Sequence, residues 1–261
     1  MNNKSLTVLI TGATGGIGYA LAKIFAGNGF PLFLVARNKK RLEEIKTEFQ
    51  AISKTDVHIL DLDLSVTGSQ QTVLSYIADN KLKIGYLVNN AGYGFQGDFL
   101  ESNAANYESM IYLNITALTS LTYEIGKQMK RDGFGRIMNV ASVAAFQPDP
   151  HFAVYGATKA YVRSFSEAVY QEFKGSGVTV TTLSPGLTQT GFIERAGMES
   201  AGIMTNIIMH VDFVAKAGYE GMMKGKRHIV PGFAYKMMTF FSQIMPVTDM
   251  KLKMIGKAMK P

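Results

Sequence analysis

The chain has 261 residues, of which 47% are hydrophobic and 18% charged, values typical of a folded globular protein rather than a disordered or fibrous one. It contains no cysteine, which excludes disulfides, thiolate metal sites and a cysteine nucleophile. The net charge of +7 comes from the C-terminal part: residues 1–213 hold 18 basic and 18 acidic residues, whereas residues 214–261 hold nine and two. A neutral body with a basic tail disfavours a nucleic-acid-binding surface.

Short apolar runs alternate along the chain with longer segments of helical period, which predicts repeated β-α-β connections and a parallel sheet. The predicted strands are Leu6–Ile10, Pro31–Ala36, Val57–Leu60, Ile84–Val88, Gly135–Ala141, Val178–Leu183 and Arg227–Val230. The predicted helices cover residues 16–28, 38–52, 67–79, 102–131, 152–174 and 211–224, with Asn38 as the N-cap of the second. The fold class is therefore α/β: a single-domain Rossmann fold with a doubly wound, seven-stranded parallel sheet and helices on both faces.

Residues 1–230 are expected to form the nucleotide-binding and catalytic domain, with a substrate-covering loop at about 187–210. The start of the chain lacks the pattern of a secretory signal, and no segment has about 18 uninterrupted apolar residues. We therefore expect a cytoplasmic protein without a membrane span.

Residues 231–261 form a basic, apolar C-terminal extension. Its first helical segment has an apolar side (Phe233, Met237, Phe240, Phe241, Ile244) and an opposite side with Lys236, Thr239 and Gln243. One interpretation is a helix packed on the body or on a partner subunit. The other is peripheral membrane contact with acidic lipid, because Lys251, Lys253, Lys257 and Lys260 follow the apolar segment.

A glycine-rich turn, T-G-A-T-G-G-I-G, follows the first strand directly and opens the first helix. Glycines at Gly12, Gly15, Gly16 and Gly18 allow a tight turn and close approach of a pyrophosphate to the positive end of that helix. A tight strand-to-helix connection without a ligand is the alternative. The position of the glycine-rich turn directly after the first strand favours dinucleotide binding. Thr14 and Ile17 belong to the same turn.

At the end of the second strand, where an acidic residue would bind the ribose hydroxyl of NAD, the chain has Ala36 and Arg37. An arginine there can pair with a 2′-phosphate, so NADP(H) is favoured over NAD(H). The alternative is that Arg37 is an ordinary solvated loop residue.

Tyr155 and Lys159 are four residues apart and share one face of a predicted helix, and Ser142 follows the fifth strand. A carbonyl reduced by hydride needs a proton donor at its oxygen, and a nearby ammonium favours the phenolate form of a tyrosine. Ser142 can hydrogen-bond the same oxygen. Taken alone, the tyrosine and lysine spacing is equally typical of an amphipathic surface helix.

From residue 6 to about 190 the chain resembles the short-chain dehydrogenase/reductase family. The T-G-x-x-x-G-x-G turn, the segment Asn89–Gly92, the helix residue Asn114, and Ser142 with Tyr-x-x-x-Lys occur in the family order. The resemblance implies that Tyr155 is the general acid or base, that Lys159 lowers its pKa and binds ribose, that Ser142 orients the carbonyl, and that Asn114 holds a water. It also implies cofactor contacts at Asp63, Leu64, Asn90, Ala91, Gly92, Pro185, Gly186, Thr188 and Thr190.

One position departs from the family pattern. Many NADP-using members have a basic residue just before the second turn glycine, where this chain has Gly15. Arg37 would then bind the 2′-phosphate with help only from Asn38, Lys39 or Arg41.

The expected function is interconversion of a ketone or aldehyde and its alcohol, and the alternative is a catalytically idle nucleotide-binding scaffold or sensor. The pocket candidates are largely apolar, which favours a hydrophobic acyl or steroid-like carbonyl substrate. They are Tyr93, Phe95, Phe146, His151, Phe152, Phe192, Met198 and Met204. The four histidines have no metal-ligand spacing, so no metal is predicted. By resemblance, a homodimer or homotetramer is expected.

Overall fold

The structure, a computed structural model, describes residues 3–192, 196–197 and 208–259. The strands are β1 (Thr7–Thr11), β2 (Leu32–Ala36), β3 (Val57–Asp61), β4 (Ile84–Asn89), β5 (Gly135–Val140), β6 (Val178–Leu183) and β7 (His228–Ile229). The α-helices are α1 (Gly16–Gly27), α2 (Lys39–Ser53), α3 (Ser69–Asp79), α4 (Ala104–Ile111), α5 (Leu118–Asp132), α6 (Ala153–Glu172), α8 (Val211–Met223), α9 (Phe233–Ile244) and α10 (Asp249–Met259). A π-helical segment, η1 (Tyr112–Ala117), and a 3-10 turn, η2 (Val143–Phe146), complete the described elements.

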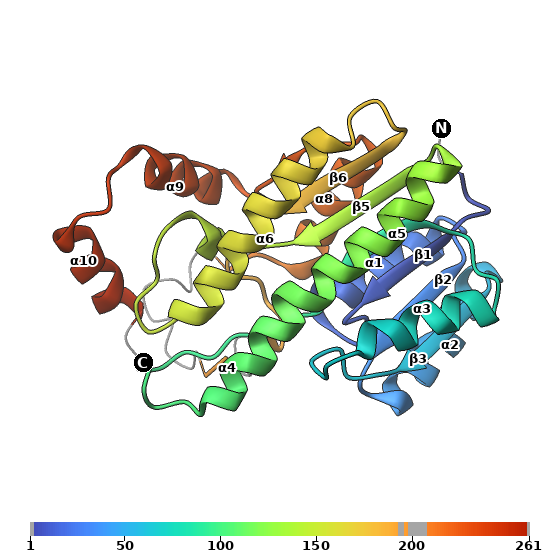
Figure 1. Cartoon of the computed structure of the whole chain (residues 1–261), viewed down its shortest axis with the longest axis horizontal. Helices are drawn as coiled ribbons and strands as arrows, with labels where there is room; N and C mark the ends of the chain where they lie inside the picture. The colour runs from blue at the N-terminus through green and yellow to red at the C-terminus, as the bar shows by residue number, and fades with distance from the viewer. Residues whose placement is uncertain (1–2, 193–195, 198–207, 260–261) are drawn as a thin grey trace.

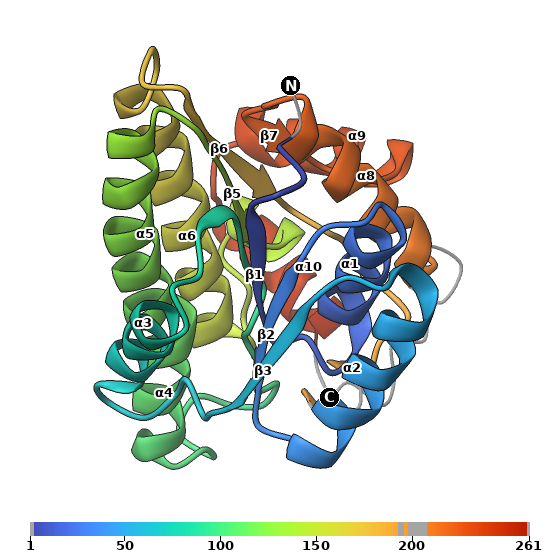
Figure 2. The same cartoon turned by 90° about the vertical axis from the view of Figure 1, so that its right-hand side faces the viewer.

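The strands form one parallel sheet in the order β3-β2-β1-β4-β5-β6-β7, which confirms the predicted single-domain, seven-stranded fold. Helices α1, α2 and α8 cover one face, and α3, α5 and α6 cover the other (Figure 2). The chain order of the strands reverses between β1 and β4. In such sheets the carboxyl ends of the strands open a crevice at the point of reversal, where ligands bind.

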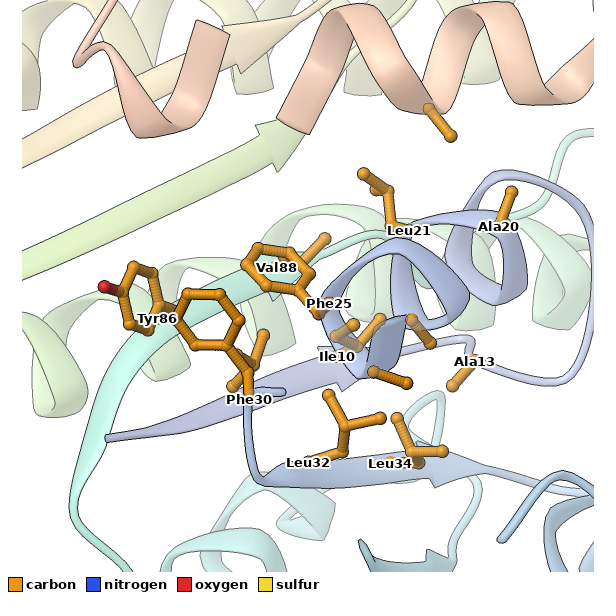
Figure 3. Packing of buried hydrophobic residues seen from close by; sticks show 14 of the residues in the cluster. Ile10, Ala13, Ala20, Leu21, Phe25, Phe30, Leu32, Leu34, Tyr86 and Val88 are labelled. Carbon is orange, nitrogen blue, oxygen red and sulfur yellow. The ribbon is translucent and has the colours of Figure 1, made fainter. Parts of the chain in front are cut away.

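Alternate residues of each central strand supply the two layers of the core. On the face of α1, Ile10 and Leu34 belong to the same buried cluster as Phe25, part of which is drawn in Figure 3. Leu9 and Phe33 point to the opposite layer, against α3 and α5. Because both faces are covered, the strands are apolar at successive positions, as the sequence predicted.

The predicted continuous helix over residues 102–131 is interrupted. Helix α4 ends at Ile111, the π-helical η1 follows, and α5 begins at Leu118. A π turn holds one more residue than an α turn and is frequent at functional sites. The interruption places Asn114 in η1, where its side chain is almost fully buried.

A row of buried polar side chains connects the sheet to α5 and α6. The Asn89 amide donates hydrogen bonds to Thr122 Oγ1 (3.0 Å) and to Asn139 Oδ1 (2.9 Å). The Asn139 amide donates to Ser166 Oγ at 2.9 Å. These bonds tie β4 and β5 to α6, the helix that carries Tyr155 and Lys159.

The C-terminal helices α9 and α10 lie beyond the carboxyl ends of β5 and β6 (Figure 1). Helix α9 contacts the body through Tyr235 and Thr239, both buried, and Ser242 donates a hydrogen bond to Gln147. Its apolar side is exposed instead. The exposed residues, called the apolar tail surface below, are Phe233, Met237, Met238, Phe240, Phe241, Ile244, Met245, Val247, Met250 and Met254. None of the helices in the described ranges is long and apolar enough to cross a bilayer.

Candidate active site

A cavity of about 1270 Å³ opens at the carboxyl ends of the strands. One end is lined by the glycine turn and the other by Ser142, Tyr155 and Lys159, so residues distant in the sequence share one space. Every predicted cofactor-binding residue except Gly18 lines this cavity.

The glycine turn packs closely against the loop that follows β4. Gly12 has φ +67°, and a Cβ there would lie 2.9 Å from both the Ala91 Cα and the Asn90 amide nitrogen. Gly18, which does not line the cavity, packs against the same Asn90 side chain. Gly15 is the N-cap of α1 and has open space beside it, with no side chain capping the helix. The free N–H groups at this helix end, with their positive dipole, fit the pyrophosphate of a dinucleotide.

Arg37 and Asp63 pair at the far end of the cavity. Their closest nitrogen and oxygen are 3.5 Å apart, and the Arg37 side chain is 70% exposed. Burial opposes ionisation of Asp63, but hydrogen bonds from Ser65 and the charge of Arg37 hold its pKa below the usual value. Asn38 caps α2 by accepting the N–H of Arg41, as predicted.

The chemical end brings together Ser142, which lies between β5 and η2, and two side chains of α6. Ser142 is the N-cap of η2, where its hydroxyl accepts the Ala144 N–H, and it lies close enough to Tyr155 to lower the pKa of the phenol. The Lys159 ammonium donates to the Val140 carbonyl at 2.8 Å and lies 5.7 Å from the centre of the Tyr155 ring. Both Tyr155 and Lys159 are buried.

Burial dominates the electrostatics of this pair. It raises the pKa of Tyr155 to about 12, with a further rise from Asp149 and an opposing contribution from Ser142. Burial also lowers the pKa of Lys159 to about 8. Without bound cofactor, Tyr155 is therefore neutral and holds its proton, whereas the resemblance implies a lowered tyrosine pKa. Desolvation penalises the charged form of each side chain.

Asn114 lies behind the cavity wall rather than in it. Its amide donates to the Tyr93 carbonyl and to Thr158 Oγ1, each at 3.0 Å. Its Oδ1 accepts the Tyr93 N–H at 3.3 Å. The π turn thereby connects the loop after β4 to α6. A Cβ on Gly92 would lie 2.9 Å from the Asn114 oxygen and 3.3 Å from the Lys159 nitrogen, so this glycine permits the close approach.

The segment after β6 is held in place by α9. The Leu187 N–H donates to the Tyr235 hydroxyl at 3.0 Å, and a side chain at Gly186 would overlap the Tyr235 ring. Thr188 pairs with Met209 across the predicted substrate loop. The residues of that loop at 193–195 and 198–207, including Met198 and Met204, lie outside the described residues.

Three predicted pocket residues do not line the cavity. Phe146 stacks on His228 and under the Arg163 guanidinium. His151 pairs with Asp98 at 2.7 Å, and Phe95 packs in the cluster beside the cavity. Tyr93, Phe152 and Phe192 do line it, and the rings of Phe152 and Phe192 lie 4.4 and 5.3 Å from that of Tyr155.

Sequence reasoning missed several lining residues at the chemical end of the cavity. Among them are Gln147, Asp149, Tyr235 and Met238. The first two stand between the signature residues Ser142 and Tyr155, so their position was a usable signal. Nothing local marks Tyr235, because its contacts are with residues almost fifty positions earlier. Among the described residues, no three potential metal ligands lie close enough together to share an ion.

Comparisons with known proteins agree with this geometry. A family model described as short chain dehydrogenase matches residues 6–200. Sulfoacetaldehyde reductase of Chromohalobacter salexigens is 35% identical over 197 residues, 74% of this chain and 77% of that protein. A short-chain dehydrogenase from Sphingobium yanoikuyae in complex with NADPH has a TM-score of 0.80 and 31% identity over 94% of this chain and 99% of that one. A bulky-bulky ketone specific alcohol dehydrogenase from Comamonas testosteroni has a TM-score of 0.80 and 28% identity, covering 93% and 92%.

The chain belongs to the short-chain dehydrogenase family, as its motifs indicated. It is an oxidoreductase of the class that interconverts alcohols and carbonyl compounds with a nicotinamide nucleotide.

Proposed function

We propose that this chain is an NADP(H)-dependent reductase of ketones or aldehydes in which Tyr155 exchanges the proton at the substrate oxygen. The observation that carries the proposal is the placement of Ser142, Tyr155 and Lys159 at one end of a cavity whose other end is the glycine turn. A nucleotide-binding scaffold or sensor would need only the glycine turn. That alternative does not explain why a tyrosine and a lysine are buried together at the other end of the cavity.

Each residue at the chemical end has a distinct task. The nicotinamide supplies or accepts hydride at the substrate carbon when the cofactor is bound. The Tyr155 hydroxyl donates the proton to the carbonyl oxygen in reduction and accepts it in oxidation. Ser142 donates a hydrogen bond to the same oxygen and so orients it. Lys159, whose pKa is about 8, is mainly an ammonium near neutrality and stabilises the phenolate that proton transfer leaves.

Preference for NADP(H) rests on the basic residues around the far end of the cavity. Arg37, Lys39 and Arg41 line it there. The ion pair of Arg37 with Asp63 is exposed and therefore weak, so the guanidinium is available to a 2′-phosphate. The NADPH complex of the Sphingobium relative supports the same assignment.

The substrate we propose is a hydrophobic carbonyl compound, acyl or steroid-like in its apolar part. Tyr93, Phe152 and Phe192 give the chemical end an aromatic wall. Planar apolar surfaces of this kind favour bulky apolar groups beside the carbonyl. The description of the Comamonas relative as specific for bulky ketones is consistent with this class.

The deciding experiment follows NADPH absorbance with a panel of carbonyl compounds for the wild type and for Tyr155→Phe. The wild type should turn over at least one compound, and the variant should lose about 10²- to 10⁴-fold in kcat while NADPH binding by fluorescence is kept. Equal rates for the two proteins would contradict the mechanism. Binding of NADPH without turnover of any compound would favour the sensor.

We also propose that the apolar tail surface contacts acidic lipid. Most of its side chains are more than half exposed, and Lys236, Lys251, Lys253 and Lys257 stand among them or directly beyond them. Flotation should occur with phosphatidylglycerol vesicles and decrease with phosphatidylcholine. Association through this surface, or through α5 and α6 as a homodimer or homotetramer, is the competing arrangement, and light scattering with and without vesicles separates the two.

A further inference from the structure

Asp149 is a buried carboxyl at the chemical end of the cavity that the proton-transfer set does not use. It stands between η2 and α6, lines the cavity, and is only 7% exposed. It is close enough to Tyr155 for its charge to raise the pKa of the phenol. An acidic side chain is seldom buried without a charged partner, because desolvation of its ionised form is costly.

Only one oxygen of this carboxyl has a partner among the described residues. The Gln147 amide nitrogen donates to Asp149 Oδ1 at 3.3 Å. The amide is oriented from its other side, because Ser242 of α9 donates to Gln147 Oε1 at 2.5 Å. Oδ2 receives no hydrogen bond from the described chain, and as Asp149 lines the cavity, this acceptor is available to a ligand.

Capping of α6 does not explain why the Asp149 carboxyl is buried at this position. The N-cap of that helix is Phe152, whose N–H donates to the main-chain oxygen of Asp149 at 3.0 Å. No side chain caps the helix. The hydrogen bond from Gln147 offsets the desolvation of the Asp149 carboxyl only in part, so burial raises its pKa to about 6.

The charges around the cavity define what Asp149 can bind. Within the described residues, Lys159 is the only other charged side chain at the chemical end, and its ammonium is directed at the Val140 carbonyl. The remaining cations of the lining, Arg37, Lys39 and Arg41, belong to the far end. An anionic group next to the substrate carbonyl would meet the Asp149 carboxylate without a cation to offset it.

We propose that Asp149, oriented by Gln147, forms a polar subsite that accepts a hydrogen bond from a hydroxyl or amino group next to the substrate carbonyl. The inference rests on the proposed function, because it takes Tyr155 as the position of the carbonyl oxygen. The substrate class becomes α- or β-hydroxy and amino carbonyl compounds with an apolar remainder. Carbonyl compounds bearing a carboxylate or sulfonate beside the carbonyl are disfavoured, which separates this chain from the relative named for sulfoacetaldehyde.

The test compares α-hydroxyacetophenone with propiophenone, which differ by hydroxyl against methyl, in NADPH-dependent reduction. The quantity measured is the ratio of kcat/KM for the two ketones in the wild type, Asp149→Leu and Asp149→Asn. The ratio should fall at least about tenfold in Asp149→Leu and less in Asp149→Asn, because a hydrogen bond to a carboxylate is lost or weakened. Propiophenone turnover reports any structural damage, and Asp79→Asn, at the exposed end of α3, is the matched control.

The outcomes separate the subsite from the reductase. Reduction of both ketones with the same ratio in wild type and Asp149→Leu would overturn the subsite and leave the proposed function standing. Failure of the wild type to reduce either ketone or any other carbonyl compound would overturn both. Benzoylformate, with a carboxylate beside the carbonyl, should be reduced at least about tenfold more slowly than propiophenone and should gain in Asp149→Leu.

Discussion

Replacing Asp149 with Asn should make the protein more stable at neutral pH, although it removes a hydrogen-bonding charge from the cavity. Burial raises the pKa of this carboxyl from 3.8 to about 6. Since a pKa change of 1 corresponds to about 1.4 kcal/mol, the charged side chain destabilises the folded protein by up to about 3 kcal/mol. Asn has nearly the same shape, retains an acceptor oxygen and carries no charge to desolvate.

The pH dependence has a defined sign. The unfolded carboxyl loses its proton near pH 4, whereas the folded one keeps its proton until about pH 6. Across this window the folded chain binds more protons, so its stability decreases as pH rises and stays lower above pH 6. The Asn variant lacks this decrease, so the difference between the two proteins should be near zero at about pH 4 and largest at about pH 7.5.

Urea or thermal unfolding of the wild type and the variant at these two pH values measures the difference. For a chain of this length, about 3 kcal/mol corresponds to an increase of roughly 6–12 °C in the melting temperature. Asp79→Asn, at an exposed position, should change little at either pH. A variant that is less stable than the wild type by the same amount at both pH values would refute the reasoning. It would mean that the contribution of Asp149 to stability does not depend on its charge.

Other consequences of the structure are measurable directly. Arg37→Asp should lower kcat/KM with NADPH at least about tenfold, because a second carboxylate beside Asp63 would repel the 2′-phosphate. The value of kcat/KM with NADH should change little. Equal losses with the two cofactors would count against the 2′-phosphate role. Gly186→Ala should lower the melting temperature by several degrees through overlap with Tyr235, and Tyr235→Ala should relieve part of that loss. Tyr235→Phe should cost about 1–3 kcal/mol in urea unfolding, since the partly buried Leu187 N–H loses its acceptor; an unchanged midpoint would contradict this.

The parts of the fold that sequence predicted are those encoded locally. Runs such as Leu32–Ala36 are apolar throughout because both faces of the sheet are covered. Asn38 is a short acceptor directly before a helix, so its capping role is readable from sequence. The glycine turn can also be predicted locally, because a positive φ such as that of Gly12 favours glycine.

The parts that could not be predicted depend on contacts distant in sequence. Phe146 stands close to Ser142 in the chain and was expected in the pocket, but η2 directs it to His228 and Arg163. Hydrophobic period alone does not reveal the extra residue of a π turn, so η1 was read through as α-helix. The apolar side of α9 was the prominent pattern in the tail, yet the contact with the body is made by Tyr235 on another side of the helix.

The row of amides and hydroxyls from Asn89 through Asn139 to Ser166 limits how α6 can move. Apolar side chains would allow a helix to slide or rotate slightly on a sheet at small cost, whereas each of these hydrogen bonds is satisfied at only one register. Ser166 is eleven positions, about three helical turns, beyond Tyr155, so the row fixes the height of that hydroxyl above the sheet from a distance. If Tyr155 exchanges the proton as proposed, the position of its hydroxyl is thus maintained by residues that do not line the cavity.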